Sequence, residues 1–244
     1  MTRVRRVVLL FSLFLLPLAL AGCGGHNVQQ KTTTWDLDPL HQSSQSVYHF
    51  SESGADRGEV RFEILHQMMN GREVIIQRRH LSGAVSGMTE TVFDSKTFAP
   101  LYLQKYEETE GILREVRLDY SDDSVKKTVS ESLFGGTEKT SNTELPPGTL
   151  DESQLLTAIR AWPLESEQSV AWRVYSLDQD TVGQAVLTAD SVKDLNLAGV
   201  TYRAQQVHLS LFGEVRNVWV EEGSRRRILL VEGPDSCRLE IEPS

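Results

Sequence analysis

Glu59-Val60-Arg61-Phe62-Glu63-Ile64 alternates polar with apolar side chains, the two-residue period of a half-buried β-strand. Asn70-Gly71 follows it and precedes a second strand-like run over residues 73–80. Asn-Gly between two such runs is a strong hairpin signal, since both residues tolerate the positive φ that a tight turn requires. The sequence therefore predicts two antiparallel strands joined at residues 70 and 71.

The same two-residue period recurs further along the chain. It is found in residues 115–120, 170–175, 206–211 and 218–220. Clean alternation buries one face of a strand and leaves the other in water, which is typical of antiparallel sheets. We expect about ten to twelve strands in a mainly β domain. The predicted fold is a strongly curved antiparallel sheet, or an open half-barrel.

One segment has a helical pattern instead. Thr149 and Glu152 have the spacing of a capping box, with Thr149 as the N-cap. The apolar residues that follow share one helical face, and they are Leu155, Leu156, Ile159 and Trp162. The sequence predicts one amphipathic helix of about eleven residues, ended by Pro163, which must bury its apolar face. The concave side of the curved sheet is the natural place for it.

Residues 1–22 have the features of a secretory signal peptide. Three arginines are followed by an apolar run of about fifteen residues, which is shorter than the roughly 20 needed to span hydrocarbon. Leu20-Ala21-Gly22-Cys23 ends the segment and resembles the lipobox of bacterial lipoproteins. The resemblance implies cleavage before Cys23, lipidation of its sulfur, and anchoring of the chain to a lipid bilayer. The alternative is an ordinary signal peptide or an uncleaved anchor.

The residues after Cys23 predict a cellular location and a flexible tether. Gly24 stands where an aspartate would resemble an inner-membrane retention signal, so a cell with two membranes would place the protein on the outer membrane, facing the periplasm. Residues 23–45 are polar and aperiodic, and we interpret them as the lipidated cysteine with a flexible tether. Trp35 and Leu37 are exceptions, which could dock on the domain or the membrane interface. Residues 46–244 are predicted to form a single β domain.

The mature chain is strongly acidic. Residues 1–22 hold three arginines and no acid, so 22 basic side chains remain against 34 acidic ones, a net charge of about −12. Such a surface repels nucleic acid, which needs basic patches. With Cys23 lipidated, Cys237 has no partner within the chain, and its alternation with Leu239 and Ile241 predicts a side chain directed into the core.

No pattern for catalysis, metal or cofactor binding stands out. The six histidines lack zinc-site spacing, although His66 and His80 flank the predicted hairpin and could face each other across it. Adjacent acids such as Glu107-Glu108 point to opposite faces of a strand and make poor catalytic pairs. There is no glycine-rich phosphate loop. The sequence predicts a protein that is not an enzyme, with no catalytic residue, metal or cofactor.

Several segments resemble one family. They are residues 90–101, which include Asp94-Ser95-Lys96-Thr97-Phe98-Ala99-Pro100-Leu101, residues 155–164, residues 196–204 and residues 218–227. They are similar to a family of exported bacterial β-proteins of unknown function, which look like open or half-closed antiparallel barrels and distantly resemble the LolA/LolB lipoprotein carriers. The resemblance covers roughly residues 47–242. It implies a fold and offers no catalytic residues.

The sequence leaves two hypotheses for the function. The first is binding of a lipid or another apolar ligand between the helix and the sheet, with Leu155, Ile159 and Trp162 as ligand contacts. The second is an envelope scaffold with a packed interior, which contacts another protein through a strand edge or through Arg225-Arg226-Arg227. We interpret the three arginines as a solvated hairpin tip.

Overall fold

The computed structural model describes residues 34–40, 43–83, 86–109, 112–132 and 136–242, and its architecture is one large sheet. Fifteen strands in these ranges follow the order β8-β7-β6-β5-β4-β3-β2-β1-β15-β14-β13-β12-β11-β10-β9. Neighbouring strands are antiparallel, except for the parallel pair β9 and β10. The prediction of a mainly β, antiparallel fold is confirmed, with more strands than expected because several are short or lack clean alternation.

The first half of the sheet runs in sequence order from β1 to β8. Its strands are β1 (Ser44–Glu52), β2 (Ala55–Met69), β3 (Arg72–Gly83), β4 (Ser86–Asp94), β5 (Pro100–Thr109), β6 (Ile112–Tyr120), β7 (Ser124–Glu131) and β8 (Thr137–Glu144). The second half holds β9 (Leu150–Asp151), β10 (Ser169–Ser176), β11 (Thr181–Leu197), β12 (Val200–Leu211), β13 (Glu214–Glu221), β14 (Ile228–Glu232) and β15 (Arg238–Ile241).

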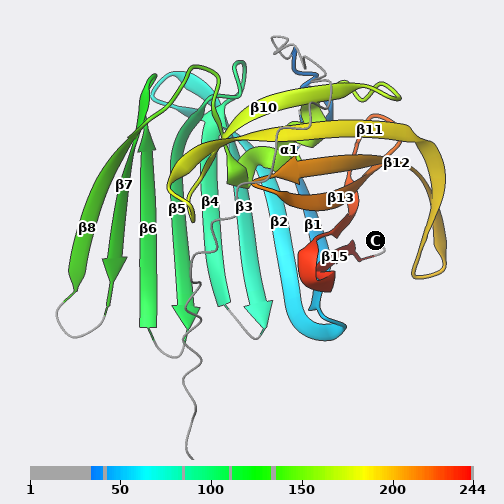
Figure 1. The fold of residues 1–244 in the computed structure, drawn as a ribbon, viewed down its shortest axis with the longest axis horizontal. Helices are drawn as coiled ribbons and strands as arrows, with labels where there is room; N and C mark the ends of the chain where they lie inside the picture. The colour runs from blue at the N-terminus through cyan, green and yellow to red at the C-terminus, as the bar shows by residue number, and fades with distance from the viewer. Residues whose placement is uncertain (1–33, 41–42, 84–85, 110–111, 133–135, 243–244) are drawn as a thin grey trace, which may run out of the picture.

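The sheet curls so that its two halves face each other. In Figure 1, β1 to β8 stand side by side, and β10 to β13 cross in front of them. The helix α1 (Leu155–Ala161) lies between the two halves. The outermost strands β8 and β9 do not pair with each other, so the sheet is a half-barrel that stays open.

The Asn70-Gly71 hairpin forms as predicted. Asn70 and Gly71 have φ angles of 52° and 77°, and Met69 pairs with Arg72 across the turn. Both residues therefore occupy the left-handed region that a primed two-residue turn requires. The register does not join the two histidines beside the turn, because His66 lies opposite Ile75 and His80 lies opposite Arg61.

The helix begins later than the sequence predicts. Asp151, not Thr149, is the N-cap: its side chain accepts from the Ser153 amide, and Gln154 completes the capping box. The residues from Glu152 to Gln154 form a 3₁₀ turn, η2, and only then does α1 start. The shift arises because Leu150 and Asp151 join β10 as the short strand β9, which holds Thr149 outside the helix. No helix in the described ranges is long and apolar enough to cross a membrane.

The inner face of the sheet supplies polar partners to the helix. The amide of buried Gln77 donates to the Ser153 carbonyl at 2.7 Å and accepts from the Thr157 hydroxyl at 2.5 Å. The hydroxyls of Thr91 and Ser153 lie 2.7 Å apart. Buried polar groups are costly unless hydrogen-bonded, so these contacts fix where the helix can sit.

The three arginines at 225–227 are not a solvated tip, which corrects that interpretation. Only Arg225 is exposed. Arg226 pairs with Asp36 at 2.9 Å and donates to the Trp162 carbonyl, while Arg227 pairs with Glu221 at 2.7 Å. Their backbone carbonyls at 225 and 226 accept from Arg160 of the helix. The segment therefore binds the end of the helix instead of facing solvent.

Residues 34–40 pack on the domain, so the predicted tether does not extend to residue 45. The Trp35 ring stacks on Phe98 with 4.7 Å between centroids and lies 5.3 Å from the Trp172 ring. Leu40, at the end of the 3₁₀ turn η1 (Asp38–Leu40), is fully buried. The aromatic and aliphatic side chains explain the difference, because each buries apolar area that a free tether would leave in water.

Asp94 organises the corner between β4 and β5. Its carboxylate accepts from the amides of Lys96 and Thr97 and from the Thr97 hydroxyl, and Arg72 pairs with it at 2.7 Å. Burial alone would raise the pKa of this carboxyl, but these donors and the Arg72 charge hold the pKa below its ordinary value. The corner holds Phe98 at a φ of 63° with its ring fully buried.

We predict that Asp94→Ala lowers the free energy of unfolding by about 2 kcal/mol, since several hydrogen bonds to one charged group are lost. Urea denaturation at pH 7 measures the change. The lowered pKa means that this stabilisation is complete above the unfolded value of about 3.9 and is lost as pH falls through the folded pKa. Asp122→Ala, at an exposed turn, is the control. Equal stabilities for the two variants would contradict the role given to Asp94.

Candidate ligand-binding cleft

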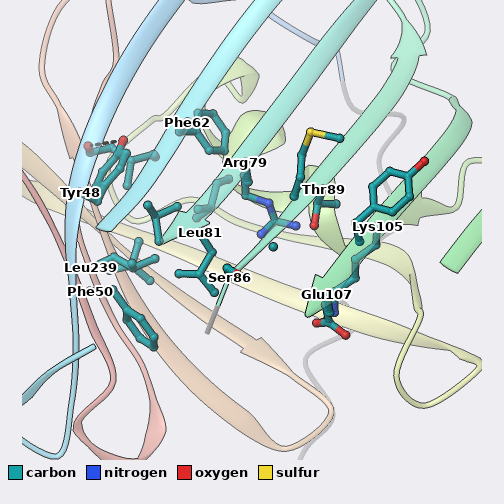
Figure 2. A pocket seen from close by; sticks show the side chains of 17 residues that line it. Tyr48, Phe50, Phe62, Arg79, Leu81, Ser86, Thr89, Lys105, Glu107 and Leu239 are labelled. Carbon is teal, nitrogen blue, oxygen red and sulfur yellow. Dashed lines mark hydrogen bonds and ion pairs between the residues drawn. The ribbon is translucent and has the colours of Figure 1, made fainter. Parts of the chain in front are cut away.

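A cleft opens between the two halves of the sheet, beside the helix. Its walls are mostly apolar, and they include Tyr48, Phe50, Val60, Phe62, Leu81, Leu156, Ile228, Val231 and Leu239. The cavity has a volume of about 310 Å³. Figure 2 shows Tyr48, Phe50, Phe62, Leu81 and Leu239 gathered on its apolar side. Ligand sites are commonly apolar clefts of this size or larger with a few polar groups.

The floor of the cleft consists of two rows of side chains that cross the strands. Because alternate residues of a strand point to the same face, in-register neighbours form continuous rows. We name the first the Leu81 row: Val60, Leu81, Gly87 and Glu107, on β2, β3, β4 and β5. We name the second the Arg79 row: Phe62, Arg79, Thr89 and Lys105, on the same strands.

A wider cavity of about 500 Å³ continues from this cleft. Both cavities are lined by Arg79, Thr89, Lys105, Leu156, Val231 and Leu239, so they are two ends of one space. The wider end adds polar and charged residues, among them Asp151, Glu152 and Arg216. The cleft is therefore apolar at one end and polar at the other, and the basic residues Arg79 and Lys105 line the part that the two cavities share.

Arg79 is the unusual residue of the cleft. Its Nε is buried without a hydrogen-bond partner, and no described residue forms an ion pair with its guanidinium. Burial lowers the pKa of the guanidinium, while the charges of Asp151 and Glu152 act in the opposite direction. Figure 2 shows the guanidinium directed into the cleft beside Thr89.

The other ionisable groups near Arg79 have partners of their own. Lys105 pairs with Glu107 at 2.6 Å, and both side chains are partly exposed at the rim. Glu152 lies 3.6 Å from Arg216, and Asp151 accepts from Tyr120 and from the Ser153 amide. Burial raises the pKa of Asp151. The acids that attract Arg79 therefore do not neutralise it by direct contact.

Residues 32–232 match the model of a family described as protein of unknown function, DUF3108. The chain belongs to the DUF3108 family. Among solved structures, it is similar to a β-barrel-like protein of the domain of unknown function DUF1849 from Brucella abortus. The two are 10% identical with a TM-score of 0.50, over 82% of this chain and 95% of that one. No curated protein sequence matches the chain.

These comparisons support part of the resemblance seen in the sequence. They establish a family of unknown function with a β-barrel-like fold. The likeness to the LolA/LolB carriers stays a prediction, as does the lipobox. Cys23 lies outside the described residues.

The DUF3108 domain separates the three predicted ligand contacts. Leu155 lines the wider cavity, whereas Ile159 and Trp162 line neither cavity and belong to the core. The Trp162 ring packs edge-on against Trp172 with 6.0 Å between centroids. Leu156, one residue further along the helix, lines both cavities. The predicted helix thus meets the cleft through its first turn.

Sequence reasoning missed Arg79, although a signal was present. Ile75, Gln77, Arg79 and Leu81 share the inward face of β3, so two polar residues fall at expected core positions. In the structure Gln77 binds the helix segment, whereas the Nε of Arg79 is buried without a hydrogen-bond partner.

Cys237 and the histidines form no reactive or metal-binding group in the described part of the chain. Cys237 is a free, partly buried cysteine that lines the wider cavity, and burial raises the pKa of its thiol. The expectation that it points into a closed core is therefore only partly met. Across the described ranges, no cluster of three or more His, Cys, Asp or Glu could hold a metal ion.

We predict that Arg79→Met raises the free energy of unfolding by about 1 kcal/mol, because the variant removes a partly buried charge that forms no ion pair and keeps its apolar volume. Arg78→Met is the matched control on the other face of β3. Arg78 pairs with Glu90 at 2.7 Å and is 37% exposed, so its loss should leave stability the same or slightly lower. Thermal and urea unfolding of both variants give the comparison. A large destabilisation by Arg79→Met would show that Arg79 has a structural role.

Proposed function

We propose that this DUF3108 protein is a lipid-anchored protein of the bacterial envelope that binds a lipid or another apolar ligand in the cleft, without catalysing a reaction. The cleft itself is the observation that carries the proposal. An open cleft with mostly apolar walls and a few polar groups is the form that ligand sites commonly take.

The anchor in this proposal is the acylated Cys23. Two or three acyl chains hold a protein stably on a bilayer, where one chain does not. Gly24 favours the outer membrane with the domain in the periplasm, if the cell has two membranes. The contact of residues 34–40 with the domain would leave only a short segment between the lipid and the fold.

We predict that Cys23→Ser abolishes acylation and signal removal together, because both depend on the cysteine of a lipobox. Cells fed a palmitate analogue with an alkyne tag should label the wild-type chain and leave the variant unlabelled. Mass spectrometry should find residues 1–22 retained in the variant. Cys237→Ser, which alters the other cysteine, should be labelled normally. Label on the Cys23→Ser chain would contradict the anchor.

The ligand site in this proposal is the cleft between the Leu81 row, the Arg79 row and Leu156. The apolar walls provide most of the binding free energy, since burial of apolar area is the dominant favourable contribution to association. Leu81 and Leu156 are only partly buried, so polar replacements there should alter the cleft without unfolding the core.

We predict that the mature chain, residues 23–244 with Cys23→Ser and produced without the signal segment, retains an apolar adduct that native mass spectrometry detects and organic extraction releases. Adding Leu81→Gln and Leu156→Gln should reduce bound adduct at least about tenfold, because two apolar contacts are lost. Leu113→Gln with Val215→Gln is the matched control, since both side chains are exposed elsewhere. Equal loss in both pairs, or an adduct-free wild type, would count against the cleft.

A second candidate is an envelope scaffold that contacts another protein through a strand edge. The edge strand β8 favours it, because this strand pairs only with β7 and its polar residues are largely exposed. The arginines at 225–227 no longer favour it, since Arg226 and Arg227 are held within the domain. In vivo crosslinking from β8, with discrete capture of one protein, is the outcome that supports the scaffold.

A further inference from the structure

The starting observation is the partly buried guanidinium of Arg79, whose Nε has no hydrogen-bond partner and which Asp151 and Glu152 attract without contacting it. A buried ionised group costs free energy unless it is paired, and arginine keeps its charge at any ordinary pH. The nearby acids hold other partners, and Lys105 is occupied by Glu107. Arg79 therefore presents guanidinium donors that the fold itself does not use.

Arg79 lies between an apolar side and a polar side of the cleft, which suggests how a ligand would be oriented. On one side the walls are apolar, formed by Tyr48, Phe50, Val60, Leu81 and Leu239. On the other side the cavity widens and becomes polar. A molecule that fills this space has an apolar part on the first side and a polar group at the Arg79 row.

We propose that the ligand is an anionic amphiphile, with its acidic head group bound by Arg79 and its apolar chain lying along the Tyr48–Leu81 side of the cleft. This inference rests on the proposed function and specifies the ligand class. The guanidinium presents N–H donors in a planar fork that matches the two oxygens of a carboxylate or phosphate. Thr89 and Lys105, in the same row, lie on the side where the head group would sit.

The test uses four amphiphiles with one twelve-carbon chain and different head groups. They are dodecanoate, dodecyl phosphate, neutral dodecanol and cationic dodecyltrimethylammonium. Displacement of the neutral fluorescent probe N-phenyl-1-naphthylamine from the mature chain, residues 23–244 with Cys23→Ser, reports all four affinities in one assay. The same assay is run on Arg79→Met, Arg79→Lys and the control Arg78→Met.

We expect the two anions to bind at least about tenfold tighter than dodecanol, as a charge-assisted hydrogen bond allows, and the cation to bind weakest. Arg79→Met should remove the preference and leave dodecanol within about twofold of wild type. Arg79→Lys should retain part of the preference, and Arg78→Met all of it. A higher affinity for dodecanoate identifies a carboxylate ligand, and a higher affinity for dodecyl phosphate identifies a phosphate one.

Two results would overturn the inference in distinguishable ways. If the probe binds but all four amphiphiles compete equally, or Arg79→Met weakens them all alike, the cleft binds apolar ligands without selecting charge. The proposed function then stands and the inference fails. If neither the probe nor any amphiphile binds the wild-type chain, the proposed function fails as well.

Discussion

The hydrogen bonds between the buried Gln77 side chain and the helix segment are the constraint on which the interior depends. Gln77 satisfies both ends of its amide on the Ser153 carbonyl and the Thr157 hydroxyl. A buried amide without such partners would cost more than a single hydrogen bond contributes, so the helix has one favourable position on the sheet. That position determines which part of the concave face is packed. The row through Gln77 is covered by the helix, whereas the next row, through Arg79, borders the cleft.

The sequence predicts the local strands and turns of this molecule better than the contacts between residues that are far apart in the chain. Alternation at residues 59–64 and the Asn70-Gly71 turn are decided by neighbouring residues, and both predictions are confirmed. The helix cap is displaced from Thr149 to Asp151 because a long-range strand pair, β9 with β10, takes the intervening residues. Arg226 behaves in the same way, because its partner Asp36 lies far away in the sequence and the local pattern predicts only a solvated tip. For Trp35 the sequence allows docking on the domain or on the membrane interface, and the structure identifies Phe98 as its partner.

In the candidate site, too, the local features are predictable from the sequence and the long-range contacts are not. The inward position of Arg79 is visible in the alternation of β3, but its lack of a partner is not, because that depends on how four strands and a helix surround it. Ile159 and Trp162 show the converse. Their apolar character predicts burial correctly and does not distinguish a ligand contact from a core contact. Of the helix residues, Leu156 reaches the cleft in both of its parts, since it lies at the edge of the packed interior.

The turn between β10 and β11 joins the open sides of the half-barrel without any strand pairing. Asp180 of this turn accepts from Tyr175 at 2.6 Å and from the hydroxyls of Thr143 and Ser141 on β8, and Lys127 of β7 donates to the Leu177 carbonyl. Burial alone would raise the pKa of Asp180, but these donors and the Lys127 charge keep it below its ordinary value. The open side of the half-barrel thus has a seam made of side-chain hydrogen bonds instead of a backbone ladder. Such a seam can be separated by breaking a few hydrogen bonds, with every strand pair left intact, so the half-barrel can widen here without loss of any part of the sheet. Its carboxylate stays charged in mild acid, and the seam weakens only when the pH falls through the lowered pKa of Asp180.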